Sequence, residues 1–156
     1  MYWRRPLTRL EMALYAALVA VVLALFLERL LTYMELAERT VMEITVSRVN
    51  SALDVQRAYD MLAGRAANDP ASLSRNPFEL AGMSPGNFHG EMDSPSLADL
   101  ERGNWVFDRA RRELIYLPRL RRGLDTADPN GAIHFKLEPR PGASHRLVPT
   151  PKYAWN

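Results

Sequence analysis

The chain has 156 residues, of which 47% are hydrophobic and 24% are charged, so it allows one modest domain with an appendage and excludes a multidomain enzyme with separate cofactor and substrate modules. Its 20 basic and 18 acidic residues give a net charge of +2, which excludes a polycation that wraps nucleic acid. Its lack of cysteine excludes disulfides, thiolate zinc sites and cysteine nucleophiles.

A membrane-spanning helix is predicted near the N-terminus. Residues 12–27 form an apolar run without a charge or a helix breaker. Flanking leucines extend the segment to residues 10–31, which rise about 33 Å as a helix and match a hydrocarbon layer of about 30 Å. Because no small-x-small cleavage site follows the run, we expect the segment to remain in the mature protein.

Basic residues set the expected orientation of this span. Residues 1–9 form a leader that carries Arg4, Arg5 and Arg9, so the positive-inside rule places the N-terminus in the cytoplasm and everything after about Leu31 across the membrane. So short a leader has no room for a cytoplasmic output domain, which argues against an ordinary transmembrane receptor.

The helix is expected to continue beyond the membrane over residues 32–67. No glycine or proline interrupts it before its expected end near Gly64. Two apolar surfaces follow the helical period, and only Arg48 breaks the first. The first surface, the apolar stripe, comprises Leu30, Met34, Ala37, Val41, Ile44, Ala52, Val55, Tyr59 and Leu62, and the second, the apolar flank, comprises Met42, Val46, Val49 and Leu53.

Two interpretations of this helix stay open because both can hold on different segments. The part after Val41 is expected to lie against its own domain as an amphipathic core helix. The part from Leu10 to about Thr40 is expected to pack against helices of other subunits.

A small α+β region is predicted over residues 68–139. Asn76 and Ser94, each before a proline, are expected to cap two short helices, with Glu79 placed for a capping box. Strands are expected over residues 104–108 and 113–118, joined by the turn Arg109–Arg112, and over residues 132–138. In the third strand the core side is Ile133, Phe135 and Leu137, and the water side is His134, Lys136 and Glu138.

Together these elements predict an α+β fold in which a long N-terminal helix packs on a small antiparallel β-meander. The proline-rich tail, residues 140–156, is expected to be irregular. Trp105, Phe107 and Tyr116 alternate on paired strands, so we interpret them as core residues instead of an exposed recognition patch.

The start of the chain resembles the type IV pilin and pseudopilin superfamily. Residues 4–11 read RRPLTRLE, which places Thr8 and Glu11 on the family's threonine and glutamate, while Pro6 stands where the family has a glycine before its cleavage point. That departure argues against removal of residues 1–6 by the prepilin peptidase. Further motifs resemble pilin-like accessory proteins of the mannose-sensitive haemagglutinin pilus: Asn76–Phe78, Pro85–Glu91, Gly103–Asp108 and Leu114–Tyr116.

This resemblance implies a single-pass bacterial inner-membrane protein with a periplasmic C-terminal domain, which helps to assemble a type IV pilus or a type II secretion pseudopilus. The implied partners are other pilin-like subunits, assembly-platform membrane proteins and the lipid bilayer. The residues expected to mediate subunit association are Thr8, Glu11, Leu14, Leu18, Val22 and Leu25.

Glu11 has two possible roles. A carboxylate carried to the middle of the bilayer costs roughly 2.5 to 3.5 kcal/mol, and in filaments of the resembling family a neighbouring subunit's positive N-terminus offsets that cost. Alternatively, Glu11 lies among the headgroups near Arg9 and needs no partner.

Six arginines form a possible partner surface for an acidic protein or anionic headgroups: Arg109, Arg111, Arg112, Arg119, Arg121 and Arg122. They support an alternative function, a membrane-anchored periplasmic binding module, although charges in turns are usually only solvated. No phosphate loop or catalytic serine or zinc motif occurs, and His89–Asp93 matches no known metal loop. We therefore expect no enzymatic activity, cofactor, metal, nucleic acid or small-molecule substrate.

Overall fold

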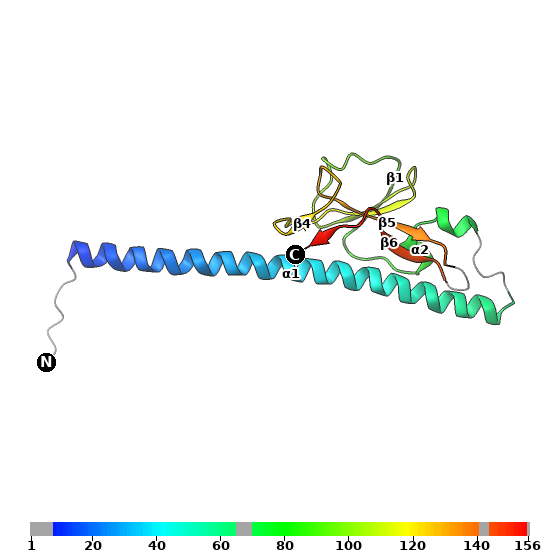
Figure 1. Ribbon diagram of the computed structural model, residues 1–156, viewed down its shortest axis with the longest axis horizontal. Helices are drawn as coiled ribbons and strands as arrows, with labels where there is room; N and C mark the ends of the chain where they lie inside the picture. The colour runs from blue at the N-terminus through cyan, green and yellow to red at the C-terminus, as the bar shows by residue number, and fades with distance from the viewer. Residues whose placement is uncertain (1–7, 65–69, 141–143, 156) are drawn as a thin grey trace. The chain divides into compact units, whose positions relative to one another are not determined.

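The computed structural model describes residues 8–64, 70–140 and 144–155. The chain forms two compact units, Met1–Ala37 and Glu38–Asn156; the second is named the head. One helix, α1 (Arg9–Leu62), begins in the first unit and ends in the head (Figure 1). Residues 1–7 of the expected leader lie outside the described residues.

Within the first unit, α1 has an exposed apolar surface. Among the described residues, α1 is the one helix that is long and apolar enough to cross a membrane. Its exposed large apolar side chains before residue 28 are Leu10, Met12, Leu14, Tyr15, Leu18, Val19, Val21, Val22, Leu23, Leu25, Phe26 and Leu27. Apolar residues on every side are typical of a helix that is surrounded by lipid or by other helices.

The C-terminal end of α1 agrees with the predicted end near Gly64. The helix ends at Leu62, and Gly64 has a φ of 66° and donates its N–H to Met61 O at 3.1 Å. A left-handed residue at this point lets the chain leave the helix while a terminal carbonyl keeps a hydrogen bond. Residues 65–67 of the expected helix lie outside the described residues.

The head contains a mostly antiparallel five-stranded sheet in the order β1-β2-β3-β5-β6 and a two-stranded sheet of β4 and β7. Strand β1 pairs with β2 in parallel, and the remaining pairs are antiparallel. The strands are β1 (Phe88–Met92), β2 (Trp105–Asp108), β3 (Glu113–Tyr116), β4 (Leu124–Asp125), β5 (Ile133–Glu138), β6 (Arg146–Pro149) and β7 (Ala154–Trp155). A 3-10 helix, η1 (Pro70–Ser74), and α2 (Pro77–Leu80) precede them.

The predicted α+β class and the hairpin are confirmed. Strands β2 and β3 pair with Trp105 opposite Tyr116, and β5 pairs with β3. The predicted cap of α2 is also confirmed, since the Asn76 side chain accepts from Phe78 N at 3.0 Å. Glu79 does not complete a capping box, because its carboxylate instead accepts from Arg75 at 2.7 Å.

The predictions for the tail and for Ser94 are also wrong. The tail is not irregular, because β6 pairs with β5 and β7 pairs with β4, and Leu147 and Trp155 supply buried side chains to the core. Ser94 does not cap a helix: its φ of 51° is left-handed, its N–H donates to Asp108 Oδ1 at 3.2 Å, and no helix follows it. An N-cap residue needs an extended backbone, which Ser94 lacks.

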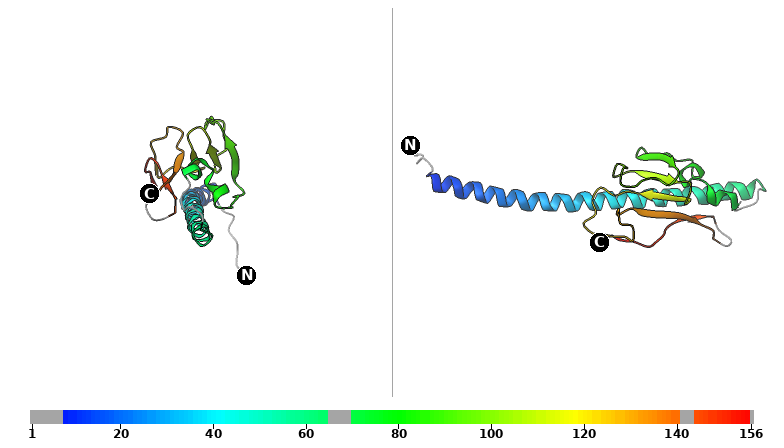
Figure 2. Two further views of the ribbon diagram at one scale, coloured as in Figure 1. Left: turned by 90° about the vertical axis from the view of Figure 1, so that its right-hand side faces the viewer. Right: turned by 90° about the horizontal axis from the view of Figure 1, so that it is seen from above.

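The main core lies between α1 and one face of the sheet, as Figure 2 shows for the part of α1 within the head. The sheet contributes Trp105, Phe107, Leu114, Tyr116, Ile133 and Phe135, and α1 contributes Met42, Val49 and Leu53. Trp105, Phe107 and Tyr116 are therefore core residues, as predicted. The apolar flank makes these contacts, whereas Val41, Ile44, Val55 and Tyr59 of the apolar stripe remain exposed.

The opposite face of the sheet has its own apolar cluster, which the loop before β2 covers. Val106, Ile115, Leu117 and Ala132 are buried there against Met92, Leu97 and Leu100. His134 was expected to face water but is only 8% exposed, because Glu113 and Asp128 lie against its two ring nitrogens. Lys136 and Glu138 become progressively more exposed toward the end of β5.

Candidate functional site

Thr8 and Glu11, the two residues that match the pilin pattern, bond to each other at the start of α1. Thr8 N donates to Glu11 Oε2 at 2.7 Å, Thr8 Oγ1 donates to the same oxygen at 3.0 Å, and Glu11 N donates to Thr8 Oγ1 at 3.2 Å. This reciprocal arrangement is a capping box, which satisfies backbone donors that the first helical turn leaves free. A threonine three residues before a glutamate and an apolar run is a sequence signature of this motif, which our sequence analysis did not use.

The capping box gives Glu11 a local role that is independent of any partner. Association of Glu11 with another subunit stays a prediction. The remaining expected association residues, Leu14, Leu18, Val22 and Leu25, are exposed and recur every three or four residues, so they share one side of α1.

A second exposed apolar surface lies on the part of α1 within the head. Val41, Ile44, Val55 and Tyr59 are between 45% and 63% exposed, although the sheet buries the neighbouring flank of the same helix. The helix therefore has more apolar surface than its own sheet covers. Apolar side chains at helical spacing on an uncovered face are typical of a surface that another protein contacts.

Glu38 connects the start of this helical segment to the loop after β3. Its Oε1 accepts from Tyr116 Oη at 2.9 Å and from Arg119 N at 2.7 Å, and its Oε2 accepts from Leu120 N at 3.1 Å. Burial raises the pKa of Tyr116, and the negative charge of Glu38 and its hydrogen bond with the phenol raise it further. The role of Glu38 could not be predicted from the sequence, because a glutamate on a helix gives no sign of a partner some eighty residues away.

The six arginines form two groups at opposite ends of β3. Arg109, Arg111 and Arg112, the turn arginines, precede the strand, and Arg119, Arg121 and Arg122, the loop arginines, follow it. The four residues of β3 alone span about 13 Å.

Carboxylates accompany the turn arginines. Arg109 pairs with Asp93 at 2.8 Å, and Arg111 Nε lies 3.9 Å from Asp108 Oδ2. The other oxygen of Asp108 accepts from Ala110 N and Arg111 N, so this buried carboxylate organises the turn itself. These contacts give the turn a structural explanation.

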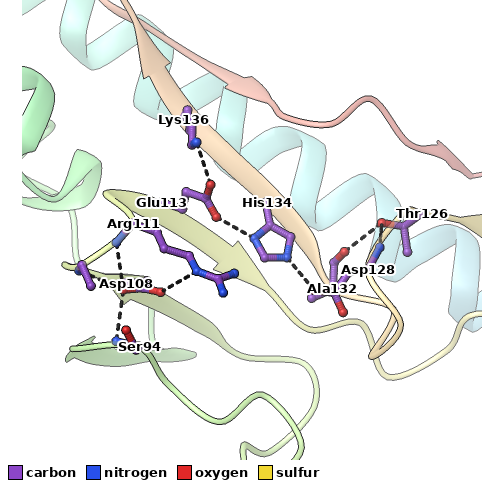
Figure 3. Close-up of polar contacts among 10 residues, drawn as sticks. Ser94, Asp108, Arg111, Glu113, Thr126, Asp128, Ala132, His134 and Lys136 are labelled. Atoms are coloured by element: carbon purple, nitrogen blue, oxygen red, sulfur yellow. Dashed lines mark hydrogen bonds and ion pairs between the residues drawn. The ribbon is translucent and has the colours of Figure 1, made fainter.

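Figure 3 shows a polar cluster on the face of the sheet opposite α1. His134 Nδ1 lies 2.8 Å from Glu113 Oε2, and His134 Nε2 lies 2.8 Å from Asp128 Oδ2. Lys136 Nζ lies 2.8 Å from the other Glu113 oxygen. A carboxylate only accepts hydrogen bonds, so each contact needs a proton on the histidine nitrogen. Both contacts are hydrogen bonds when both ring nitrogens carry protons, and a neutral ring can form only one of them.

This cluster joins β3, β5 and the segment between β4 and β5. Every polar group in it has a partner within the head, which indicates a structural role. A cleft of about 440 Å³ lies next to it, lined by Ser94–Ala98, Asp108, Arg111, Ile115 and Asp128–Asn130. Among the described residues, no group of three or more histidine, aspartate and glutamate side chains is placed to hold a metal ion.

Comparison with protein-family models, with curated proteins and with solved structures found no match to this chain. The architecture itself, a long apolar N-terminal helix followed by a β-sheet, is pilin-like.

Proposed function

We propose that the protein is a non-enzymatic, pilin-like subunit or accessory factor of the bacterial inner membrane. It would act in the assembly of a type IV pilus, of the mannose-sensitive haemagglutinin kind, or of a type II secretion pseudopilus. The observation that carries this proposal is the apolar surface of α1, which is exposed in the first unit and again along the apolar stripe of the head. An anchor alone would not need the second exposed surface.

In this proposal the two exposed parts of α1 act in different solvents. Residues 10–31 lie in the bilayer as a single span, with the N-terminus in the cytoplasm, and pack against other pilin-like helices or an assembly-platform protein. Because lipid tails are as apolar as leucine, side-chain packing supplies most of that association. In the periplasm the apolar stripe contacts a partner by removing apolar area from water, at about 25 cal/mol per Å².

Site-specific photocrosslinking in native membranes tests this proposal. Crosslinkers at Leu18 and Val22 probe the membrane segment, and crosslinkers at Ile44 and Val55 probe the apolar stripe. Gln56, which is also exposed and adjacent to Val55, is the matched control. We expect adducts with pilin-like or assembly-platform proteins from the four apolar positions and few from Gln56. A monomer without adducts at all four positions would contradict the proposal.

The alternative function, a membrane-anchored binding module, is favoured by the cleft beside Arg111. The two functions differ in what they require of the membrane helix. If the head alone, exported to the periplasm from about residue 38, restores function to a deletion strain, the helix is only an anchor and the binding module is the better description. If only the full chain restores function, helix association is required.

A further inference from the structure

The loop arginines are attached closely to the first residue of the head. Glu38, where the head begins, accepts from Arg119 N at 2.7 Å and from Leu120 N at 3.1 Å. Glu38 comes only seven residues after Leu31, the end of the predicted span. A fully extended chain of that length places Glu38 at most about 25 Å from Leu31. The loop arginines are therefore tethered near the end of the span, whatever the orientation of the two units.

In the part of the chain that the structure describes, the loop arginines Arg119 and Arg121 donate to uncharged acceptors. Arg119 Nε donates to Arg102 O at 3.3 Å, and an Arg121 guanidinium nitrogen donates to Asn130 O at 2.8 Å. Both acceptors are backbone carbonyls, which carry no net charge. Within the described ranges no carboxylate forms an ion pair with the loop arginines, in contrast to Arg109, which pairs with Asp93.

Among the head residues of this surface, guanidinium groups outnumber carboxylates by one. Glu38 directs both oxygens at backbone N–H groups and the Tyr116 hydroxyl. Asp125 is the exposed carboxylate nearest in sequence to the loop arginines, and exposed Glu101 is next to Arg102. Against these two and the negative charge of Glu38, Arg102 adds a fourth guanidinium to the three exposed loop arginines, donating to Pro118 O at 3.2 Å.

Two glycines let the arginine side chains lie flat against the backbone. A Cβ at Gly103 would overlap the Arg119 side chain, and a Cβ at Gly131 would overlap that of Arg121. Together with their hydrogen bonds to backbone carbonyls, this close approach restricts the side chains of Arg119 and Arg121, which lowers the entropy lost on binding.

We propose that the loop arginines dock the head onto the anionic phospholipid surface of the membrane that anchors it. The inference rests on the proposed membrane anchoring. Basic side chains near a span are attracted to anionic headgroups within about a Debye length, and the planar guanidinium donates two parallel hydrogen bonds to a phosphate. Docking restricts the orientations of the head at the membrane surface, which presents the apolar stripe to partners in a limited range of directions.

Full-length protein in nanodiscs tests the inference. The chain has no cysteine, so one introduced at Leu120 carries a single fluorophore, and one at Ala110, among the turn arginines, serves as the matched control. Lipids with a spin label on the headgroup quench the fluorophore when it lies close to the membrane surface. We expect quenching at Leu120 to be strong in discs containing phosphatidylglycerol and weak in pure phosphatidylcholine or at high salt, while quenching at Ala110 stays low in both.

Charge variants separate docking from folding. The triple variant R119Q/R121Q/R122Q should weaken docking on the order of 100-fold, whereas R119K/R121K/R122K, which keeps the charges, and R109Q/R111Q/R112Q should retain most of it. Equal quenching at Leu120 in the two lipids, or a lysine variant as weak as the glutamine variant, would overturn the inference. The inference would also be overturned if the glutamine variant lost crosslinks to an acidic protein in native membranes while quenching at Leu120 did not depend on the lipid.

The outcome also separates this inference from the proposed function. Extraction of the full chain from membranes by alkaline carbonate would refute the proposed anchoring and docking together. A chain that resists extraction but shows no lipid dependence at Leu120 would refute docking alone.

Discussion

Removing the Glu38 carboxylate should loosen the loop after β3 from α1 and destabilise the head. In the Glu38→Ala variant three donors lose their acceptor: Tyr116 Oη, Arg119 N and Leu120 N. Arg119 is exposed, so water replaces its lost bond at little cost. Tyr116 is only 4% exposed, and its hydroxyl lies where water has limited access.

The magnitude follows from these environments. A hydrogen bond to a charged group contributes about 1.5–3 kcal/mol, and a buried donor left without a partner costs about 1–3 kcal/mol. Allowing for hydration of the exposed N–H, we expect Glu38→Ala to lower the free energy of unfolding by about 2–4 kcal/mol. Tyr116→Phe removes the donor together with its need for a partner and should cost about 1 kcal/mol.

Urea unfolding of the detergent-solubilised protein measures both values. Trp105 is buried with its ring centroid 4.7 Å from that of Tyr116, so tryptophan fluorescence reports on this region. The double variant should be less destabilised than the sum of the single variants by about 1 kcal/mol, because the two side chains interact directly. Additive effects, or a Glu38→Ala variant within about 0.5 kcal/mol of the wild type, would refute the reasoning.

The same pair predicts a dependence on alkaline pH. The ordinary pKa of tyrosine is 10.0, and the folded state raises that of Tyr116 through burial first and through Glu38 second. The neutral phenol is thus favoured in the folded state, so its contribution to stability is fully present below pH 10 and is lost as the pH rises above that value. Tyr116→Phe should reduce the fall in stability above pH 10, and an unchanged fall would contradict this assignment.

Three further predictions concern other parts of the chain. Gly103→Ala should destabilise the head by about 1–3 kcal/mol, because Gly103 has a φ of 86° and a Cβ there meets a side chain, whereas Gly86→Ala, with open space, should be neutral in the same urea assay. Burial lowers the pKa of His145 from 6.5, so the free energy of unfolding should fall as the pH drops below that value. The fall should be smaller in His145→Gln. An equal pH dependence in the wild type and the variant would exclude His145 as the cause. Glu11→Gln should keep the capping box with Thr8 but lose co-assembly, whereas Glu11→Ala should lose both. Hydrogen exchange of the first helical turn measures the capping box. Normal co-assembly of Glu11→Gln would show that the charge has no partner.

The regions where sequence reasoning failed share a physical cause. Strand β6 has four residues and β7 has two, so neither is long enough for a period of two to stand out, and Pro149 gives a misleading signal. Each becomes a strand only because a neighbour pairs with it and a core receives Leu147 and Trp155. His134 was misplaced for a related reason, since alternation along β5 identifies two faces but not that Glu113 and Asp128 lie against His134 on one of them.

The sequence by itself determined the local features of this protein: the apolar helix, its end near Gly64, the hairpin from Trp105 to Tyr116 and the cap at Asn76. These follow from interactions among residues close together in the chain. Only the tertiary structure decided that the apolar flank of α1 meets the sheet while the apolar stripe stays exposed, and that Glu38 holds the loop after β3. Two apolar surfaces of one helix have the same helical period, and the choice between them depends on the shape of a sheet formed from distant segments.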